Sequence, residues 1–496
     1  MRTAYARPRS LLARLWVVLR ALVLVAALVA AVLAYRALTA PPLALVQVWS
    51  RTLRDTGHPI ALSSPNVATL EGEQAVVVGD RSGHVYAFSL ATGRAVKGWP
   101  ASTGGVPVDS TPSVAELSPG SPDETVFVGV GNSARPKQGG YEAFNADGTE
   151  RWFVDVKNPP TDPKAGRTSA VQASLAVGDL QGTGPSIVAP SLGQEEYAIN
   201  ANSGRVLPGF PWFTSDSGFS TPALADLYGK GQTDIVEGGD QTAGIAYGSH
   251  YQDGGHLRVL SPEGNFGTGN PSGGLKCHYD TDQVVQSSPA VGPFLAGESL
   301  GIAVGTGTYW AHASSTNKLL AFGARCNLVW TASLDGSTGS SPALADVQGD
   351  GMLDVVEGTD NGHGGGSVYA LEGATGSVLW RRGVRGEVIG GVVTAELSKG
   401  HQDVVVPTTH GAVVLNAMTG RLIESLVPYL GLQDSPLVTR DPNGTVGITL
   451  AGYNGYNQGE IVHFQLAGSR WGDLDEAGTW PMFHDNPQLT GSVGTG

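Results

Sequence analysis

Residues 340–380 read SSPALADVQGDGMLDVVEGTDNGHGGGSVYALEGATGSVLW and contain four short apolar runs separated by polar or glycine-rich turns. The last two runs flank the pair Thr375-Gly376, where glycine can adopt the positive φ of a tight hairpin turn. Short runs of residues that favour β-structure, bounded by such turns, are typical of β-strands. The stretch therefore predicts one sheet of four short strands.

The opening motif of this stretch, a small-residue or Ser/Pro step followed by an apolar run, occurs eight times along the chain. A repeat of four short strands in about 50 residues is typical of a β-propeller blade. The sequence therefore predicts an all-β fold, an eight-bladed β-propeller of four-stranded blades over residues 44–466. The eight copies are SSPNVATL (63–70), STPSVAEL (110–117), ASLAVGDL (173–180), STPALADL (220–227), SSPAVGPF (287–294), SSPALADV (340–347), GGVVTAEL (390–397) and DSPLVTRD (434–441).

The two ends of the repeated region indicate how the ring of blades closes. The last unit, within residues 435–466, has three apolar runs and no obvious fourth. The stretch ALVQVWSRTL (44–53) resembles the fourth run of other units, such as NLVWTASL (327–334). We expect residues 44–53 to complete the last blade, which removes an exposed sheet edge. Residues 467–496 are expected to form a C-terminal tail that covers the ring.

Composition and charge limit the classes of function. Glycine accounts for 71 of the 496 residues and charged residues for only 15%, which disfavours long amphipathic helices and coiled coils. Residues 1–40 contain six arginines and no acid, so the rest of the chain has 24 basic and 44 acidic side chains. A body this acidic repels phosphate groups. We therefore expect no nucleic-acid partner.

Residues 15–35 are apolar apart from Arg20 and are long enough to cross a bilayer as a helix. Arginines precede this run, so residues 1–14 are expected to be a basic cytoplasmic segment, with the propeller outside. We expect a single-pass signal anchor in the cell membrane, preceding the propeller as one transmembrane helix. The alternative is a signal peptide cleaved near Val32-Leu33-Ala34, which would release a secreted protein.

The chain has two cysteines, Cys277 and Cys326. Two cysteines in an exported protein indicate one disulfide, and the alternative is a pair of buried thiols. In the repeat alignment, Cys277 falls in the fourth strand of blade 4 and Cys326 in the turn before the fourth strand of blade 5. A disulfide between neighbouring blades is consistent with this placement.

Two known repeat families resemble different parts of the unit. The run ALEGATGSVLW (370–380) resembles the repeat of quinoprotein-type (PQQ-like) propellers, in which the glycine makes the turn and the tryptophan docks between adjacent blades. The run ALADVQGDGMLDVVEG (343–358) resembles the FG-GAP (VCBS) repeat of integrin-like propellers. The tail WPMFHDNPQLTG (480–491) also resembles a segment of quinoprotein-like propellers. These resemblances imply the fold over residues 44–491, but both repeats occur in proteins with many functions.

The FG-GAP resemblance implies one calcium loop with a structural role. Its oxygen ligands would be side chains at loop positions 1, 3, 5 and 9, with glycine at position 6 for the turn. Gln348 is neutral where Asp or Asn is usual, which should weaken calcium binding. The alternative is an acidic β-turn held by hydrogen bonds to its own backbone. The predicted ligands are Asp346, Gln348, Asp350, Asp354 and the backbone carbonyl of Met352.

The quinoprotein resemblance raises the question of a quinone cofactor and an oxidoreductase activity. Quinoprotein dehydrogenases of this fold typically carry adjacent cysteines at the cofactor. The two cysteines of this chain are 49 positions apart, so we do not expect PQQ. The histidines occur singly, without an H-x-H or H-E-x-x-H pattern, and no G-x-S-x-G motif is present.

The longest loops join the second and third strands of five blades and should emerge on one face of the ring. Function commonly lies on loops held by a rigid scaffold, and aromatic rings beside Asn, Asp and Gln suit glycan stacking or protein hot spots. The alternative is that these rings pack loop against loop. The candidate partner-binding residues in these loops are Tyr247, Tyr251, Tyr309, Trp310, Tyr453 and Tyr456.

Together these features predict a membrane-anchored extracytoplasmic propeller that binds an envelope protein or glycan without catalysis. The first alternative is an enzyme on the same scaffold, either a quinoprotein-type oxidoreductase or a polysaccharide-acting enzyme. A third hypothesis is an assembly factor for other envelope proteins, similar to lipoprotein propellers of the quinoprotein type. No cysteine lies directly after the apolar run, so lipid attachment is not expected, although the anchor could replace it.

Overall fold

The chain divides into two units, Met1–Pro42 and Leu43–Gly496. The predicted segment 1–14 lies outside the described residues, as does the anchor 15–35 apart from Leu19 and Arg20. Within the described part of the chain, no helix has the length and apolar character needed to cross a bilayer. The computed structural model describes residues 19–20, 45–118, 120–158, 168–241, 253–268, 273–398, 401–467 and 479–493.

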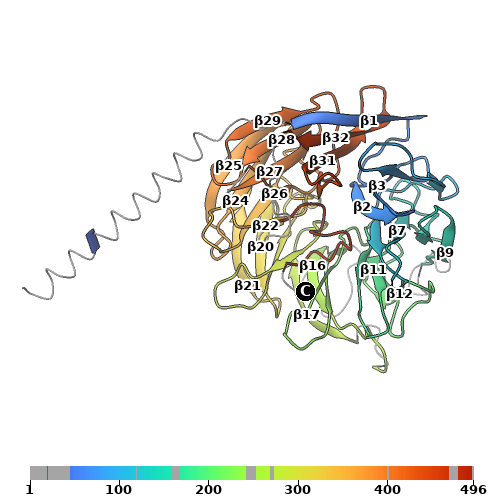
Figure 1. Ribbon diagram of the computed structural model, residues 1–496. Helices are drawn as coiled ribbons and strands as arrows, with labels where there is room; N and C mark the ends of the chain where they lie inside the picture. The colour runs from blue at the N-terminus through green and yellow to red at the C-terminus, as the bar shows by residue number, and fades with distance from the viewer. Residues whose placement is uncertain are drawn as a thin grey trace, which may run out of the picture. The chain divides into compact units, whose positions relative to one another are not determined.

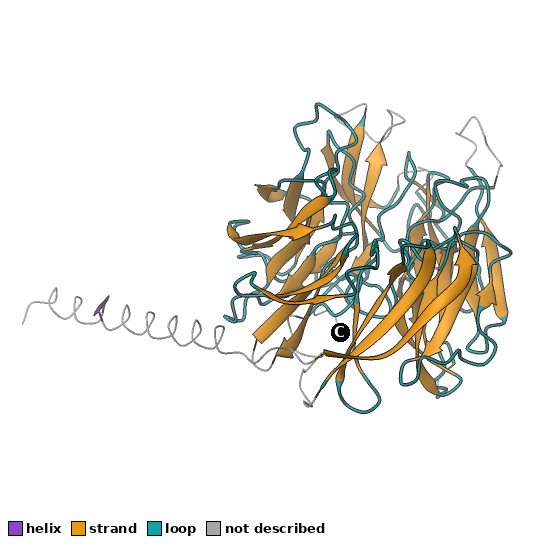
Figure 2. Ribbon diagram, turned by 90° about the horizontal axis from the view of Figure 1, so that it is seen from above, coloured by secondary structure: helices purple, strands orange, loops and turns teal. Residues whose placement is uncertain are grey.

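The second unit is an eight-bladed β-propeller, as the repeat predicts (Figure 1). Its described strands form eight sheets, each with four antiparallel strands in a meander. The view in Figure 2 shows strands joined by loops throughout this unit. Blades 1 to 4 consist of β2 (Asn66–Leu70), β3 (Glu73–Gly79), β4 (His84–Ser89) and β5 (Ala101–Ser102); β6 (Ser113–Ala115), β7 (Thr125–Val130), β8 (Gly140–Phe144) and β9 (Glu150–Asp155); β10 (Ala176–Gly178), β11 (Ser186–Pro190), β12 (Glu195–Asn200) and β13 (Trp212–Phe213); β14 (Ala223–Ala225), β15 (Asp234–Gln241), β16 (Gly254–Leu260) and β17 (Leu275–Thr281).

The remaining four blades follow the same plan, with the innermost strand first and the outermost strand last. They consist of β18 (Ala290–Gly292), β19 (Gly301–Gly305), β20 (Lys318–Gly323) and β21 (Leu328–Ser333); β22 (Ala343–Ala345), β23 (Asp354–Gly358), β24 (Gly365–Leu371) and β25 (Val378–Arg385); β26 (Val393–Ser398), β27 (His401–Thr408), β28 (Gly411–Asn416) and β29 (Leu422–Leu426); β30 (Leu437–Arg440), β31 (Val446–Tyr453), β32 (Gln458–Leu466) and β1 (Leu45–Thr56).

The first strand of the propeller closes the ring. β1 pairs antiparallel with β32, from Leu45 opposite Leu466 to Thr56 opposite Gln458, and so forms the outermost strand of blade 8 (Figure 1). The innermost strand of blade 1, β2, contacts that of blade 8, β30. Chain segments from both ends of the propeller therefore share one blade.

The loops of a meander alternate between the two faces of the ring. We name the upper face as the one that carries the loops between second and third strands and the connections between blades. The lower face carries the loops between first and second strands and between third and fourth strands. This division follows from the antiparallel strand order of every blade.

Tryptophans on outermost strands, or in the case of Trp99 just before one, join neighbouring blades. At six of the eight junctions, an indole N–H donates a hydrogen bond of 2.6–3.0 Å to a carbonyl in a turn of the next blade. The turn glycine lies against the ring: a Cβ on Gly376 would lie 2.6 Å from the Trp330 ring. This confirms the docking implied by the quinoprotein resemblance. The donors and acceptors are Trp49 and Leu90, Trp99 and Ala146, Trp152 and Ala201, Trp212 and Gly273, Trp330 and Gly373, and Trp380 and Ala417.

A disulfide joins blades 4 and 5, where the tryptophan is missing. Cys277 in β17 is bonded to Cys326, in the turn between β20 and β21. Cys277 pairs with Val259 just before a register shift, as Trp330 pairs with Ala321, so the two occupy equivalent positions. Cys326 has φ +58°, a conformation that glycine supplies in the other turns. The disulfide therefore takes the place of the tryptophan–glycine contact.

The C-terminal segment 479–493, which we name the plug, runs through the middle of the ring (Figure 1). Backbone N–H groups of the innermost strands donate hydrogen bonds of 2.8–3.1 Å to its carbonyl groups, and the side chain of Trp480 is buried in the core. The plug is thus a structural part of the propeller. The bonded pairs include Val114 and Pro487, Val177 and Gln488, Leu224 and Thr490, Val291 and Gly491, and Val438 and Pro481.

Candidate binding face

Two of the predicted partner-binding aromatics lie in the upper loop of blade 5. Tyr309 is 67% exposed, and its ring meets that of Trp310 edge-on at 4.9 Å between centroids. The backbone of Trp310 is fixed by Gln283, whose side-chain amide donates to the Trp310 carbonyl at 2.9 Å and accepts from the Trp310 N–H at 3.0 Å. Tyr309 is therefore presented to solvent from a well-supported loop. Tyr247 and Tyr251 lie outside the described residues.

The other two predicted aromatics differ from each other. Tyr456 is 82% exposed. Tyr453 is half-buried, its hydroxyl accepts a hydrogen bond from Gln433 at 3.3 Å, and a Cβ on Gly431 would lie 2.7 Å from its ring. Tyr453 thus packs one loop against another, which was the alternative to partner binding for the aromatic residues of these loops.

A third exposed tyrosine, Tyr429, lies in the connection from blade 7 to blade 8 and is linked to the Tyr456 loop through Glu460. Tyr429 is 55% exposed and its hydroxyl donates to a Glu460 carboxylate oxygen at 3.0 Å. Asn454 donates to the other Glu460 oxygen at 3.4 Å and accepts the Tyr456 N–H at 2.9 Å. Burial and Glu460 raise the pKa of Tyr429 to about 12, so it stays a hydroxyl donor. We name Tyr429, Asn454, Tyr456 and Glu460 the tyrosine patch.

Tyr429 was not among the predicted residues because it lies in the connection from blade 7 to blade 8. These connections also emerge on the upper face, and the prediction considered only loops within blades.

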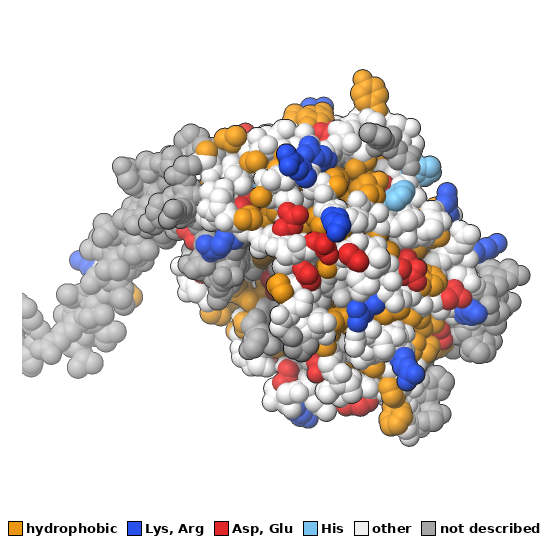
Figure 3. Space-filling model, turned by 45° about the vertical axis from the view of Figure 1, so that its right-hand side comes forward, with side chains coloured by type: hydrophobic (Ala, Val, Ile, Leu, Met, Phe, Trp, Pro, Cys, Tyr) orange, Lys and Arg blue, Asp and Glu red, His pale blue; other side chains and the backbone are white. Residues whose placement is uncertain are grey.

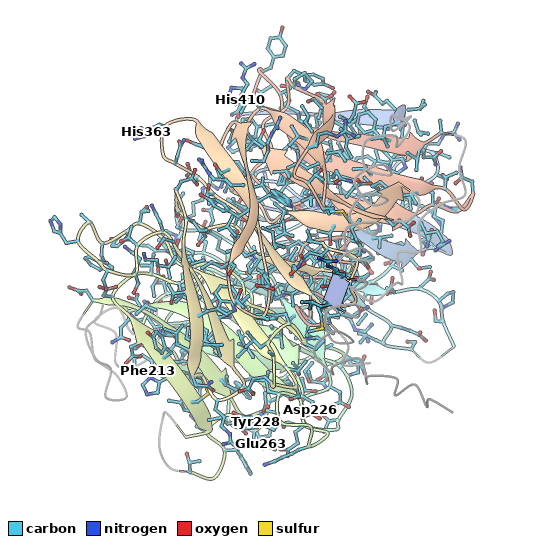
Figure 4. The ribbon with its side chains drawn as sticks, turned by 90° about the vertical axis from the view of Figure 1, so that its left-hand side faces the viewer. Phe213, Asp226, Tyr228, Glu263, His363 and His410 are labelled. Atoms are coloured by element: carbon cyan, nitrogen blue, oxygen red, sulfur yellow. A yellow bond between two sulfur atoms is a disulfide. The ribbon has the colours of Figure 1, made fainter. Side chains whose placement is uncertain are left out.

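His363 and His410, in upper loops of blades 6 and 7, are exposed and lie on the same side of the molecule (Figure 4). The exposed upper side chains therefore include imidazole and phenol groups. On the part of the surface drawn in Figure 3, Asp and Glu side chains gather near the middle of the view.

A cavity of about 120 Å³ lies on the propeller axis, lined by residues from all eight blades and by Phe483 of the plug. Its lining comes from the connections just before the innermost strands, which places it at the centre of the upper face. A second cavity of about 330 Å³ lies beside it near blades 2 and 3, and Phe219 lines both. The axial cavity is the concave centre of the candidate binding face.

Six hydroxyl groups surround this axial cavity, and we name them the hydroxyl ring. Each accepts a hydrogen bond of 2.8–3.2 Å from a backbone N–H of the preceding blade. Blade 7 has Gly391 at the equivalent position. The ring therefore joins neighbouring blades near the axis, as the tryptophans do at the rim. Its members are Ser64, Thr111, Ser174, Thr221, Ser288 and Ser341.

The predicted calcium loop lies on the lower face, between β22 and β23. Asp346 accepts three backbone N–H groups of its own loop, from Gly349 at 2.7 Å, Asp350 at 3.0 Å and Gly351 at 2.9 Å. In the described residues, no group of three Asp, Glu, His or Cys side chains is arranged to hold a metal ion. The contacts of Asp346 are those of the hydrogen-bonded acidic turn, and the calcium prediction gains no support from them.

The other members of the predicted calcium set are placed as follows. Met352 is 49% exposed, and its N–H donates to Asp350 at 3.0 Å. Asp354 is buried, and one oxygen accepts the Gly373 N–H at 3.2 Å. Burial and the nearby Asp350 raise the pKa of Asp354 to about 6, while a hydrogen bond with Gln348 lowers it.

The loop of blade 4 between β14 and β15 corresponds to the predicted calcium loop of blade 6 and has Lys230 at the position of Asp350. Asp234 is paired with Lys276 of β17, and the Lys230 ammonium lies 5.9 Å from the Tyr228 ring centroid. The cationic partner of Asp234 thus comes from the outermost strand of the same blade and not from the loop itself. Asp226 and Tyr228 lie together near Glu263 at this end of blade 4 (Figure 4).

A buried charged cluster between blades 3 and 4 was missed by the sequence reasoning. Glu237 lies 3.6 Å from both His256 and Arg258, and Arg258 donates to the Thr214 carbonyl at 2.8 Å. Burial and repulsion by Glu237 raise the pKa of Glu196 well above its usual range. Burial, with the charge of Arg258, lowers the pKa of His256 to about 4. These four side chains are at most 2% exposed, which suits a joint between blades better than a reaction centre.

The residues around the axial cavity do not fit a quinone cofactor of the PQQ type. No lysine or arginine is among the lining residues, although such a cofactor carries several carboxylates that require cationic partners. The cavity is also smaller than the 300–1,000 Å³ usual for drug-sized ligands. Both cysteines are joined at the junction of blades 4 and 5, so they do not form an adjacent pair at the axis.

Residues 278–455 match the PQQ_2 family model, described as outer membrane protein assembly factor BamB. The match covers just over a third of the chain. It supports the PQQ-like repeat; the FG-GAP and VCBS resemblance stays a prediction. In the comparison with curated proteins, no sequence matches this chain.

Several solved structures are similar to the whole propeller. BamB from Moraxella catarrhalis is 16% identical, with a TM-score of 0.50, covering 86% of this chain and 98% of that one. Quinohemoprotein alcohol dehydrogenase ADHIIG from Pseudomonas putida HK5 is 14% identical, with a TM-score of 0.57 and coverage of 86% and 76%. A europium-containing methanol dehydrogenase is 10% identical, with a TM-score of 0.54 and coverage of 85% and 93%. At these identities the likeness shows the fold alone, a β-propeller.

Proposed function

We propose that this protein is a non-catalytic scaffold of the cell envelope whose upper face binds another envelope protein. The observation that carries the proposal is the tyrosine patch on blade 8. Tyr429 and Tyr456 are more than half exposed, yet Glu460 and Asn454 hold the surrounding loops in place. Tyrosines of this kind are enriched among binding hot spots, because a large rigid ring contributes contact area at low entropic cost.

The family match supports a scaffold rather than an enzyme. The model that matches residues 278–455 is described as an assembly factor for outer membrane proteins. Oxidoreductases of the same fold are also similar, but that likeness concerns the fold and not the activity. The axial cavity does not fit their cofactor, so we propose a role in the assembly or organisation of envelope proteins.

The proposal includes the membrane anchor and the orientation inferred from residues 1–35. With the N-terminus in the cytoplasm, residues 36–44 would connect the anchor to β1, and the propeller would lie outside the membrane. This arrangement would restrict the scaffold to partners at or near the same membrane.

The test is a cross-linked pull-down of the full-length protein from its own membranes, followed by mass spectrometry. We expect one stoichiometric envelope protein. We expect Tyr429→Ala with Tyr456→Ala to weaken its capture at least about fivefold, the loss when one hot spot worth about 1 kcal/mol is removed. Val329→Ala with Val378→Ala, which changes exposed residues on outermost strands, serves as the matched control. No stoichiometric partner, or equal loss in both double variants, would count against the proposal.

A further inference from the structure

The hydroxyl ring has hydrogen-bonding capacity that the fold does not use. Each of its six hydroxyls accepts one N–H, but in the described residues none of them donates its own proton to an acceptor. All six are at most 8% exposed and all line the axial cavity. Buried hydroxyl groups normally find an acceptor, so six unused donors around one cavity favour an occupant that accepts from them.

Two further buried groups of blade 8 line the same cavity without a partner. One carboxyl oxygen of Asp434 and the hydroxyl of Ser435 make no hydrogen bond in the described structure. Asp434 is 2% exposed and Ser435 is 1% exposed. Leaving such buried groups unpaired is costly, so an occupant that bonds to them is favoured.

The charge of the cavity favours a neutral occupant. Of its two acids, Asp109 is already neutralised by Arg81, with oxygen–nitrogen distances of 2.7 and 3.0 Å, and also accepts from Asn132 at 2.9 Å. Burial raises the pKa of Asp434 well above its usual range, which favours the neutral carboxyl over the carboxylate. With no cation in the lining, an anionic ligand would have no counter-charge.

The remaining lining residues favour an occupant with both polar and apolar faces. Phe219 and Phe483 supply aromatic surface, and the amides of Gln172, Gln286 and Gln433 supply donors and acceptors at the partly exposed mouth. Rings beside amide groups suit the C–H face and the hydroxyl groups of a sugar. At about 30 Å³ per water molecule, the cavity holds roughly four waters or one end of a small polyol.

We propose that the axial cavity is a binding site for a neutral, multiply hydroxylated ligand, either a free polyol or sugar or the terminal sugar of a glycan. Its hydroxyl oxygens accept from the hydroxyl ring, and its own protons are donated to Asp434 and the glutamine amides. This site is distinct from the tyrosine patch and does not depend on the proposed protein partner.

The test is titration of the full-length protein with glucose, N-acetylglucosamine and a chitin trisaccharide, in a detergent without a sugar headgroup. Binding is followed by saturation-transfer NMR and calorimetry, with cyclohexanol and acetate as probes that lack the polyol pattern. We expect sugar binding with a Kd in the millimolar range, corresponding to about 4 kcal/mol. A preference for the trisaccharide would assign the site to glycan ends, and equal affinity would assign it to free sugars. Tighter binding of acetate than of any sugar would overturn the proposal.

The variant Gly339→Trp is designed to fill the cavity while leaving the six residues of the hydroxyl ring unchanged. Gly339 lines the cavity, and a Cβ there would meet no atom within 4 Å. Gly383→Trp, where a Cβ also meets nothing, places the same ring on outermost strand β25 as the matched control. We expect affinity to fall at least tenfold in Gly339→Trp only. Unchanged sugar binding in Gly339→Trp, with a normal melting temperature, would show that sugars bind elsewhere.

Asp434 supplies a second, independent test. Asp434→Asn preserves a neutral hydrogen-bonding group and should keep affinity within about threefold, whereas Asp434→Leu should lose at least tenfold. If no sugar binds to the wild type and a crystal structure shows only ordered water in the cavity, the site is a water channel and the proposal is wrong.

Discussion

At the scale of single residues, the junction of blades 4 and 5 shows how two chemistries can occupy one position. Cys277 has the strand register of Trp330 and Trp380, and Cys326 has the positive φ of the turn glycines. The two cysteines thus replace a packing contact by a covalent bond. Both solutions fix the rim of one blade against the next.

This equivalence predicts that the two solutions can be exchanged. Cys277→Ser with Cys326→Ser should lower the free energy of unfolding by about 3–4 kcal/mol, the loop-entropy value for a loop of this length. Cys277→Trp with Cys326→Gly should recover part of that loss, because it restores the docking contact of the other junctions. Urea unfolding of the three proteins gives the comparison. If the Trp/Gly variant is no more stable than the Ser/Ser variant, the positions are not equivalent.

A second residue-scale prediction concerns Glu142 in β8. Burial and the charge of Glu150 raise its pKa to about 8. A carboxyl whose pKa is higher in the folded than in the unfolded state contributes its full stabilisation below the unfolded-state pKa, near 4.5. This contribution to the free energy of unfolding is lost as the pH rises towards the folded-state pKa of about 8. Between pH 5 and 8, the wild type should therefore lose up to about 1.4 kcal/mol per pH unit relative to Glu142→Gln.

The measurement is the free energy of unfolding of both proteins at several pH values in this window. Glu150→Gln, which changes the exposed neighbour, is the control and should flatten the difference only slightly. A stability difference between wild type and Glu142→Gln that stays constant from pH 5 to 8 would show that Glu142 is ionised throughout.

Much of the candidate chemistry could be located from the sequence, but its partners could not. The spacing of Cys277 and Cys326 predicted a link between blades, because repeat alignment assigns each residue to a strand. The repeat alignment did not reveal that Lys276 pairs with Asp234, since that contact joins different strands. Tyr429 was missed for a similar reason, because which connections reach the upper face follows from the meander and not from loop length.

At the scale of elements, the strands were predictable because each repeats the same pattern of short apolar run and turn. The closing strand could be recognised since ALVQVWSRTL has the tryptophan of other outermost strands, and Trp49 indeed donates to Leu90 of blade 1. The position of the plug was harder to predict from the sequence. It is held mainly by backbone hydrogen bonds to innermost strands, and backbone groups have no sequence signature.

The plug should contribute strongly to stability through one side chain. Trp480 is 2% exposed and packs in the core around blades 5 to 7, so Trp480→Ala should cost about 3–5 kcal/mol. Phe483 is half-exposed at the axial cavity, and Phe483→Ala should cost much less. Thermal and urea unfolding of both variants gives the measurement. Equal losses, or none in Trp480→Ala, would show that the plug is not an integral part of the core.

At the scale of the whole propeller, inner and outer contacts between blades make a rigid platform. Hydroxyl groups join six pairs of neighbouring blades near the axis, and tryptophans or the disulfide join seven pairs at the rim, in the part of the chain that the structure describes. The lower face carries tight acidic turns, whereas the upper face carries the longer loops, the exposed tyrosines and the axial cavity. A platform with one elaborated face suits a scaffold that holds a partner in a fixed orientation.

The most direct test of this account asks which face meets the partner. A photo-cross-linking amino acid is placed at Tyr456 on the upper face, at Val378 on the rim or at Met352 on the lower face, all three of which are exposed. After irradiation of intact membranes, we predict that one envelope protein is captured in high yield from position 456 only. Capture from position 352 or 378 with equal or higher yield would contradict the assignment of the upper face as the binding face.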